Sequence, residues 1–197
     1  HVDNPANMVL GHEFAGEVVK VNSAEHEHLL GTRVGVQSFR SCGVCTFCRT
    51  GRENLCRDMI HIGHAQGWGD REYFPGAYAE YCIGWADLLH PLADTVTSAE
   101  AALADIYCVA MHVVGRTKLY EGAAVLCIGG GPAGLSIAQI AELAGAKDIV
   151  LSDPSPMAQK VIREFDRYAV IDPSERELSG SIAELRGDRK FAAVFDS

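Results

Sequence analysis

Four cysteines lie close together in the first half of the chain, at a spacing that suits a metal ion. They follow the pattern C-x2-C-x2-C-x7-C and are Cys42, Cys45, Cys48 and Cys56. Thiolates at this spacing allow one short loop to surround a zinc ion tetrahedrally. Because sulfur fills all four positions, none remains for water or substrate, so we expect a structural zinc. Unligated thiols, a pair of disulfides and an iron–sulfur cluster are the alternatives.

A glycine-rich motif in the second half is typical of a phosphate-binding turn. Gly129, Gly131 and Gly134 form G-x-G-x-x-G directly after the apolar residues 124–128 and at the start of a predicted helix. In a strand–turn–helix context, such glycines permit the tight turn, the close approach of a pyrophosphate and close packing of the helix on the sheet. The helix N-terminus then attracts the anion. The motif therefore predicts a dinucleotide cofactor.

Three further residues refine the predicted cofactor site. Pro132, at the first helical position, has no N–H, so the Ala133 amide is the better candidate donor to phosphate. Asp153 ends the next predicted strand. A carboxylate there can accept hydrogen bonds from the adenosine ribose hydroxyls and would repel a 2′-phosphate, which favours NAD over NADP. The alternative for Asp153 is a simple helix N-cap ahead of Pro154.

The segments that position these motifs change character near the middle of the chain. In the first half, glycine and proline punctuate short predicted strands at 14–21, 33–38 and 77–83. From residue 98 onward apolar strands alternate with helices, and Thr97 or Ser98 is placed to cap the first helix. The predicted strands there are 124–128, 148–152, 169–171 and 191–195, and the predicted helices are 132–143 and 156–165. This alternation predicts a parallel sheet covered on both faces.

Composition limits the partners of the chain. A length of 197 residues, nearly half of them apolar, suffices for one large or two small domains. The net charge of −9 and the pI near 5.3 disfavour nucleic acid and anionic membranes, so small molecules are the expected partners. No apolar run is long enough to cross a bilayer, and no secretory signal is recognisable. The seven cysteines suit metal binding better than disulfides, which indicates a reducing compartment, the cytoplasm.

Together, these motifs resemble those of the medium-chain zinc-containing alcohol and polyol dehydrogenases. The segment GHEFAGE at 11–17 resembles the family's G-H-E signature, and the four cysteines match its structural zinc lobe. The segment GAYAEY at 76–81 is similar to the stretch that leads back into the family's first domain, and residues 128–134 match its cofactor loop. The resemblance extends over essentially the whole chain, which is expected to be an internal fragment of a longer protein.

The resemblance implies an α/β protein with two domains. A partial GroES-like, β-rich catalytic domain is expected in residues 1–95, incomplete at its N-terminus and carrying the structural zinc lobe at 42–56. A Rossmann domain that binds NAD is expected in residues 96–197, truncated after the fourth strand of its doubly wound parallel sheet. The change of pattern itself puts the boundary between residues 92 and 98.

In the family a second zinc is catalytic, and the resemblance implies which residues hold it here. His12 is the histidine of G-H-E, and Asp105 occupies a position at which family branches carry cysteine, glutamate or aspartate. Cys108 is the rival to Asp105, which could also be an ordinary acid favoured by the helix dipole. Glu13 is expected close behind the metal, approaching it transiently, unless it is a solvated strand carboxylate. The family's remaining ligand, an upstream cysteine, and its proton-relay residue would precede His1.

Other histidines carry weaker signals. His61, His64 and Trp68 lie in a glycine-rich stretch where the family often builds its substrate pocket, so one of them could contact substrate. His26 and His28 occupy a polar turn that is expected to be a solvated loop rather than a metal site.

The resemblance implies a zinc-dependent oxidoreductase that transfers hydride between a secondary alcohol or polyol and NAD. The expected partners are a small-molecule alcohol and, in the full-length protein, further copies of the chain, whereas neither nucleic acid nor membrane is expected. The fragment alone is expected to be inactive. The alternatives are a non-catalytic module that binds zinc and dinucleotide, and a zinc-free quinone-type reductase, against which His12, Glu13 and the cysteine lobe argue.

Overall fold

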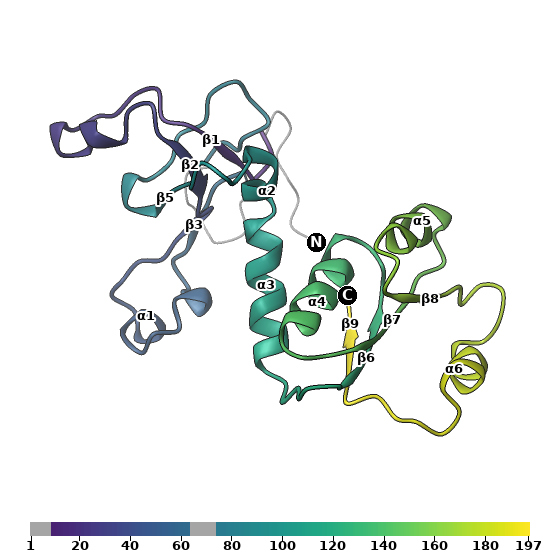
Figure 1. Ribbon diagram of the computed structural model, residues 1–197. Coiled ribbons are helices and arrows are strands. Elements are labelled where there is room, and N and C mark those ends of the chain that lie inside the picture. The colour runs from purple at the N-terminus through teal and green to yellow at the C-terminus, as the bar shows by residue number, and fades with distance from the viewer. Residues whose placement is uncertain (1–8, 64–73) are drawn as a thin grey trace. The chain divides into compact units, whose positions relative to one another are not determined.

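The computed structural model describes residues 9–63 and 74–197. The chain divides into two compact units, His1–Asp105 and Ile106–Ser197, and each is described by itself (Figure 1). Helix α3 (Ala104–Gly115) begins at the end of the first unit and continues into the second. The domain limits of 1–95 and 96–197 stay a proposal.

The first unit contains a small antiparallel sheet. Strand β2 (Arg33–Val36) pairs with β1 (Ala15–Glu17) on one side and with β5 (Leu89–Pro91) on the other. A separate two-stranded ribbon joins β3 (Phe39–Arg40) to β4 (Ile60–His61). The short helices are η1 (Ala24–Leu29), α1 (Thr46–Arg49), η2 (Glu53–Leu55), η3 (Ala86–Leu88) and α2 (Ser98–Ala102). The strands predicted at 14–21 and 33–38 are therefore present but shorter.

The strand predicted at 77–83 is wrong. These residues are irregular. The N–H groups of Ala77 and Tyr78 donate instead to the carbonyls of the two residues that precede His12, at 3.0 and 2.9 Å. Tyr78 and Tyr81 are exposed, so their rings do not gain the burial that makes aromatic residues favourable on a strand face.

Helix α2 begins at a capping box, which confirms the predicted cap. The Thr97 hydroxyl accepts a hydrogen bond from the Glu100 N–H at 3.2 Å, and the Thr97 N–H donates to the Glu100 carboxylate at 2.8 Å. The helix contacts β1 and β2, and Arg33 of β2 donates to the Val96 carbonyl at 2.8 Å, just ahead of the cap. These contacts fix α2 on the sheet and so fix the start of α3, where Asp105 lies.

The second unit is an α/β unit with a parallel sheet, as predicted. Its strands lie in the order β8–β7–β6–β9 and are β6 (Ala124–Ile128), β7 (Asp148–Ser152), β8 (Ala169–Ile171) and β9 (Ala193–Asp196). Its further helices are α4 (Pro132–Leu143), α5 (Pro156–Glu164) and α6 (Leu178–Arg186). The chain moves from β6 out to β8 and then returns to β9 on the other side of β6. The carboxyl end of β6 is therefore a topological switch point, where open parallel sheets bind ligands.

Both faces of this sheet are covered. Alternate residues of a strand point to opposite faces. Val125 and Cys127 of β6 belong to a buried cluster that includes Ile137 of α4, whereas Leu126 belongs to a second cluster with Ile182 of α6. Burial raises the pKa of the Cys127 thiol to about 12. This cysteine is therefore a neutral core residue rather than a metal ligand.

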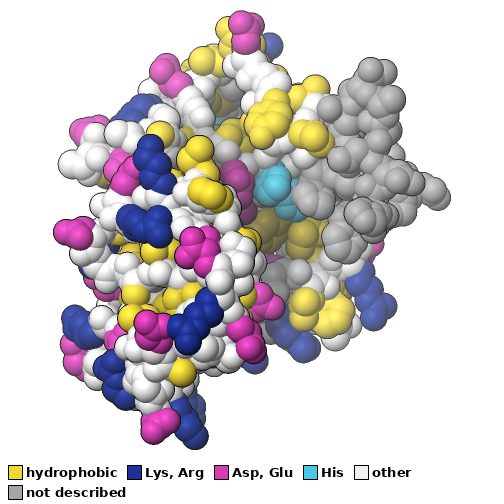
Figure 2. All heavy atoms as spheres, turned by 90° about the vertical axis from the view of Figure 1, so that its right-hand side faces the viewer, with side chains coloured by type: hydrophobic (Ala, Val, Ile, Leu, Met, Phe, Trp, Pro, Cys, Tyr) yellow, Lys and Arg dark blue, Asp and Glu magenta, His cyan; other side chains and the backbone are white. Residues whose placement is uncertain are grey.

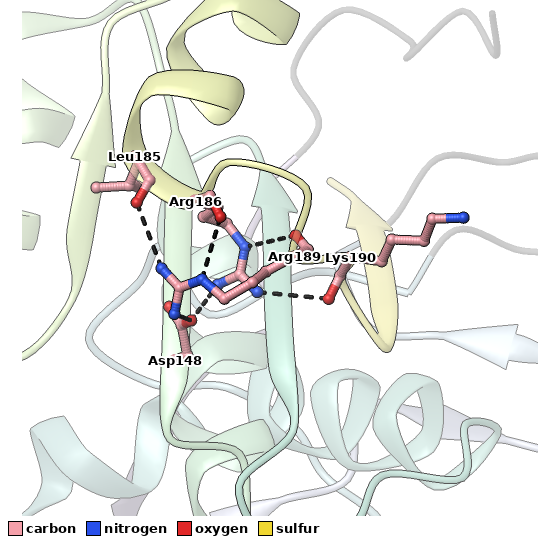
Figure 3. Close-up of polar contacts among 5 residues, drawn as sticks. All are labelled: Asp148, Leu185, Arg186, Arg189 and Lys190. Atoms are coloured by element: carbon pink, nitrogen blue, oxygen red, sulfur yellow. Dashed lines mark hydrogen bonds and ion pairs between the residues drawn. The ribbon is translucent and has the colours of Figure 1, made fainter.

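A buried arginine joins α6 to the sheet. The sequence pattern predicts neither this helix nor the burial of the arginine. Arg186 is only 5% exposed and pairs with Asp148 at the start of β7 (Figure 3). Its guanidinium also donates to the carbonyls of Arg189 and Lys190, at 3.2 and 3.4 Å, and lies 4.3 Å from the centre of the Phe191 ring. These partners compensate the cost of burying the charge.

The surface carries charges of both signs. Basic and acidic side chains are interspersed on the face drawn in Figure 2, so the net charge of −9 does not gather into a field of one sign there. Among the described helices, none combines the length and the apolar character that a bilayer crossing requires.

Candidate functional site

The four clustered cysteines converge as a metal centre requires. Their sulfur atoms all lie within 4.8 Å of one another, with Cys48 Sγ at 3.9 Å from Cys42 Sγ and at 3.5 Å from Cys45 Sγ. Zinc–sulfur bonds of about 2.3 Å place tetrahedral sulfurs about 3.8 Å apart, so the donor set fits one zinc ion. The thiols are free, and these separations are far beyond a sulfur–sulfur bond, which speaks against the disulfide alternative.

Local backbone holds this centre together. Helix α1 carries Cys48, and the N–H of Cys42 donates to Cys56 Sγ at 3.3 Å, which closes the loop. A hydrogen bond from the Cys48 backbone lowers the pKa of the Cys45 thiol to about 6. Burial raises the pKa of the Cys48 thiol to about 11. Since the thiolate is the form that binds metal, the lobe has one sulfur, that of Cys45, ready at neutral pH and another, that of Cys48, that a metal must deprotonate.

Three glycines hold the backbone that leads into His12. A Cβ on Gly63 would lie 2.2 Å from the Gly11 carbonyl oxygen, and a Cβ on Gly76 would lie 2.3 Å from the Leu10 carbonyl oxygen. Only glycine permits two backbones to approach this closely. The chain on either side of residues 64–73 is therefore packed directly against the G-H-E segment, which gives the motif a fixed place.

His12 meets two carboxylates in the first unit. One ligand atom from each of His12, Glu13 and Asp105 lies within 4.8 Å of the other two. His12 and Asp105 are half-buried and Glu13 is exposed. Imidazole and carboxylate are both zinc ligands, so this donor set fits a second zinc ion, although the ligand roles themselves stay a prediction. Within the described ranges Cys108, the rival to Asp105, does not join this group and is exposed.

Fold contacts explain why positions so far apart in the sequence meet. His12 lies shortly before β1, and Asp105 lies shortly after α2, near the start of α3. Because α2 packs on β1 and β2, the start of α3 lies near the start of the sheet. The carboxylate of Glu13 belongs to the same group but is exposed, so both its predicted place behind the metal and the solvated alternative stay open.

The remaining histidines separate into two kinds. His61, on β4, contacts the His12 ring at a centroid distance of 5.1 Å and stacks on Phe39 at 6.3 Å. His26 and His28 lie on η1 and contact neighbouring Glu25: the His26 Nε2 lies 3.1 Å from its carboxylate and the His28 Nδ1 lies 2.9 Å from its carbonyl oxygen, as expected for a local turn. His64 and Trp68 lie outside the described residues. Sequence reasoning missed Phe39, because a two-residue strand leaves no periodic signal.

The glycine loop has the form that a pyrophosphate needs. Gly129 has φ of +102°, and a Cβ on Gly134 would lie 2.0 Å from the Gly129 carbonyl oxygen, so α4 lies close on the loop. A Cβ on Gly131 would meet nothing within 4 Å, which leaves open space at the N-cap of α4. Pro132 occupies the first turn, and Ala133 follows it at the helix N-terminus, where an N–H can face an anion.

Asp153 is not the N-cap of α5, so that alternative is wrong. Ser155 is the cap, and its hydroxyl accepts from the Ala158 N–H at 3.5 Å. The two carboxylate oxygens of Asp153 accept from the N–H groups of Gly130 and Ser155, each at 2.7 Å. Asp153 therefore bridges the glycine loop to the end of β7. The contact with Gly130 was not foreseen, because the fingerprint alone does not say what its second position touches.

Comparisons with known proteins agree with this fold and with the motifs. Residues 1–94 match the alcohol dehydrogenase GroES-like domain. The chain is 30% identical over 182 residues to a sorbitol dehydrogenase of Bacillus subtilis, covering 92% of this chain and 50% of that protein. It is 33% identical over 181 residues to an L-threonine 3-dehydrogenase of Aeromonas hydrophila, again covering 92% of this chain and 50% of that protein.

A solved structure extends the match to the second unit. The crystal structure of a zinc-binding dehydrogenase from Sinorhizobium meliloti, bound to NADP, superposes with a TM-score of 0.84 at 28% identity, covering 98% of this chain and 55% of that one. In fold and motifs the chain is thus similar to dehydrogenases that combine a GroES-like domain with a Rossmann domain. These similarities agree with the resemblance of its motifs to the medium-chain zinc-containing alcohol and polyol dehydrogenases. It spans about half the length of the curated relatives it matches.

Proposed function

We propose that the protein containing this chain is a zinc-dependent oxidoreductase that transfers hydride between a secondary alcohol or polyol and NAD. One observation carries the proposal: ligand atoms of His12, Glu13 and Asp105 converge within 4.8 Å, in a unit that also gathers four cysteine sulfurs. The names of the relatives, a sorbitol dehydrogenase and an L-threonine 3-dehydrogenase, support a hydroxyl-bearing substrate.

The catalytic centre would be held by His12 and Asp105. When bound there, zinc supplies Lewis-acid chemistry, lowering the pKa of an alcohol hydroxyl as it lowers that of water. Asp105 offers a harder ligand than a thiolate at the same position, which favours a more electrophilic and more exchangeable metal. Glu13, exposed beside them, is near enough to approach the metal transiently. The cysteine centre would hold a structural zinc, since its four sulfurs leave no open position.

The cofactor loop supports NAD as the hydride carrier. The open space at Gly131 and the Ala133 amide suit a pyrophosphate. Each oxygen of Asp153 accepts one backbone N–H and keeps a further lone pair for a ribose hydroxyl. Its fixed negative charge would repel the 2′-phosphate of NADP. Asp153→Ser should therefore lower the ratio of kcat/KM for NAD over NADP by about tenfold or more. An unchanged ratio would remove Asp153 from the cofactor site.

The proposal also covers the partner, the cellular location and the oligomeric state of the protein. A small-molecule alcohol is the partner, supported by the acidic composition and by the relatives. A cytoplasmic location is supported by the free cysteines, which a reducing compartment preserves. A homo-oligomeric full-length protein is implied by the resemblance alone.

Metal analysis and turnover together test the activity. The full-length protein, purified with zinc, should oxidise secondary alcohols or polyols with formation of NADH and should hold one zinc at each centre. Asp105→Ala should lose the catalytic zinc and turnover, whereas Cys108→Ser, a matched change on the same helix, should keep both. Zinc at the cysteine centre alone, with no turnover in any metal-loaded sample, would favour a non-catalytic module. Turnover that survives His12→Ala would favour the zinc-free reductase.

A further inference from the structure

We propose that His61 is a positioning residue for His12: its ring packs edge to face against the His12 imidazole and holds that imidazole in the orientation that binds the metal. The two ring centroids lie 5.1 Å apart with an interplanar angle of 85°. Such a T-shaped pair is a favoured aromatic arrangement. The inference rests on the proposed function, since it presumes that His12 binds a metal ion.

Side-chain contacts fix the His61 ring on its own account. In the β3–β4 ribbon His61 stands directly opposite Phe39, and the two rings stack at 6.3 Å with an interplanar angle of 30°. The His61 Nδ1 lies 3.1 Å from the Ile62 carbonyl oxygen, which can only accept, so Nδ1 carries the proton in this contact. Stacking on Phe39 restricts the rotation of the ring, and the hydrogen bond adds to this restriction.

Backbone packing fixes the distance between the two histidines. Gly63 follows His61 by two positions, and Gly11 immediately precedes His12. These two glycines touch so closely that a Cβ on Gly63 would lie 2.2 Å from the Gly11 carbonyl oxygen. Ile62, which lies between His61 and Gly63 in the sequence, is fully buried and donates its N–H to the Ser38 carbonyl at 2.8 Å. Segment 61–63 therefore cannot withdraw from His12 without breaking core contacts.

The contact has a specific consequence for the metal. A histidine ligand binds well only when its ring plane points a nitrogen at the ion, and neighbours around the ligand normally set that plane. Here the packed His61 ring does so, and we assign the effect to the shape of this ring, which also stacks on Phe39. The sequence offers a control, because His28 has the same kind of Nδ1 contact, 2.9 Å from the Glu25 carbonyl oxygen, but lies in the exposed helix η1.

Metal titration of variants in the full-length protein tests this. Apoprotein titrated with Co²⁺ reports each centre by its own absorption spectrum, and the cysteine centre in the same sample serves as a folding control. His61→Ala should weaken Co²⁺ binding at the His12 centre about tenfold, at the low end of the loss expected when a ligand's orienting neighbour is removed. The cysteine centre should be unchanged. His61→Phe should restore the affinity and the spectrum, and His28→Ala should resemble the wild type.

Two results would overturn the inference. Wild-type affinity at the His12 centre in His61→Ala would mean that the contact does not orient the ligand. A His61→Phe variant as weak as His61→Ala would mean that a ring nitrogen acts, as ligand or hydrogen-bonding group. A wild-type protein that binds Co²⁺ only at the cysteines is a different result, because it refutes the proposed function along with the inference.

Discussion

The two candidate metal centres of the first unit are built in opposite ways. The cysteine centre comes from one continuous stretch, Cys42 to Cys56, and its geometry follows from a short loop and one turn of helix. The His12 centre joins residues from opposite ends of the unit and depends on glycine packing, a sheet and a capped helix. Local spacing therefore encodes the first centre, whereas only the completed fold encodes the second.

Removing a thiolate should have the largest effect and should stay local. Cys48 is buried at the cysteine centre, so Cys48→Ser should release that zinc and lower the free energy of unfolding by about 3 kcal/mol or more. Denaturant unfolding and zinc analysis measure both effects. Because the His12 centre shares no ligand with the lobe, folded variant protein should still bind metal there. Loss of both metals from protein that is still folded would contradict the separation of the centres.

A change in the second unit should destabilise without affecting either metal. Arg186→Ala removes a buried guanidinium and leaves Asp148 without its principal partner, which should cost about 2–3 kcal/mol. Asp148 is partly exposed, so water should compensate part of the loss. Urea denaturation gives the cost, and zinc content should stay at wild-type level. A variant as stable as the wild type would mean that the network in Figure 3 contributes little.

Crowding the glycine contact should damage the His12 centre selectively. Gly63→Ala places a methyl group 2.2 Å from the Gly11 carbonyl oxygen at a φ of +59°, so we expect about 2 kcal/mol of destabilisation and weaker Co²⁺ binding by His12. Gly16→Ala is the matched control, because nothing lies within 4 Å of its Cβ and its φ is not positive. Equal Co²⁺ affinities in the two variants would refute a role for this packing.

Acid should loosen helix α2, which precedes the start of α3, where Asp105 lies. Hydrogen bonds from the Thr97 backbone and side chain lower the pKa of Glu100. A pKa that is lower in the folded state means stability that is present above the ordinary value and is lost as pH falls through the folded value. Thr97→Ala should therefore raise the Glu100 pKa toward its ordinary range, measured by NMR titration. A Glu100 pKa that does not respond would show that the capping box is not formed in solution.

Sequence reasoning succeeded where the signal was local or periodic. The cysteine spacing, the Thr97 cap and the apolar strands of the parallel sheet all follow from neighbours in the chain. The predictions from sequence failed where tertiary contacts decide the local structure. Residues 77–83 use their N–H groups on the segment before His12 instead of a sheet, and helix α6 depends on a few apolar contacts and on buried Arg186.

For the candidate site, the residues could be predicted from the sequence, but their meeting in space could not. The resemblance supplied His12 and Asp105, but nothing in the spacing brings them together, since their meeting requires α2 to pack on β1. The contact between His61 and His12 depends on Gly11 and Gly63, whose closeness no linear pattern contains. Likewise, the Asp153 carboxylate reaches the Gly130 N–H because β7 lies beside β6 in the sheet, which the sequence motif alone does not state.

Anomalous diffraction at the zinc absorption edge, from crystals of the full-length protein grown with zinc, would show whether the first unit holds two separate zinc ions. We expect one peak enclosed by the sulfurs of Cys42, Cys45, Cys48 and Cys56 and another between the His12 imidazole and the Asp105 carboxylate. A peak at the cysteines with none between His12 and Asp105 would contradict this expectation.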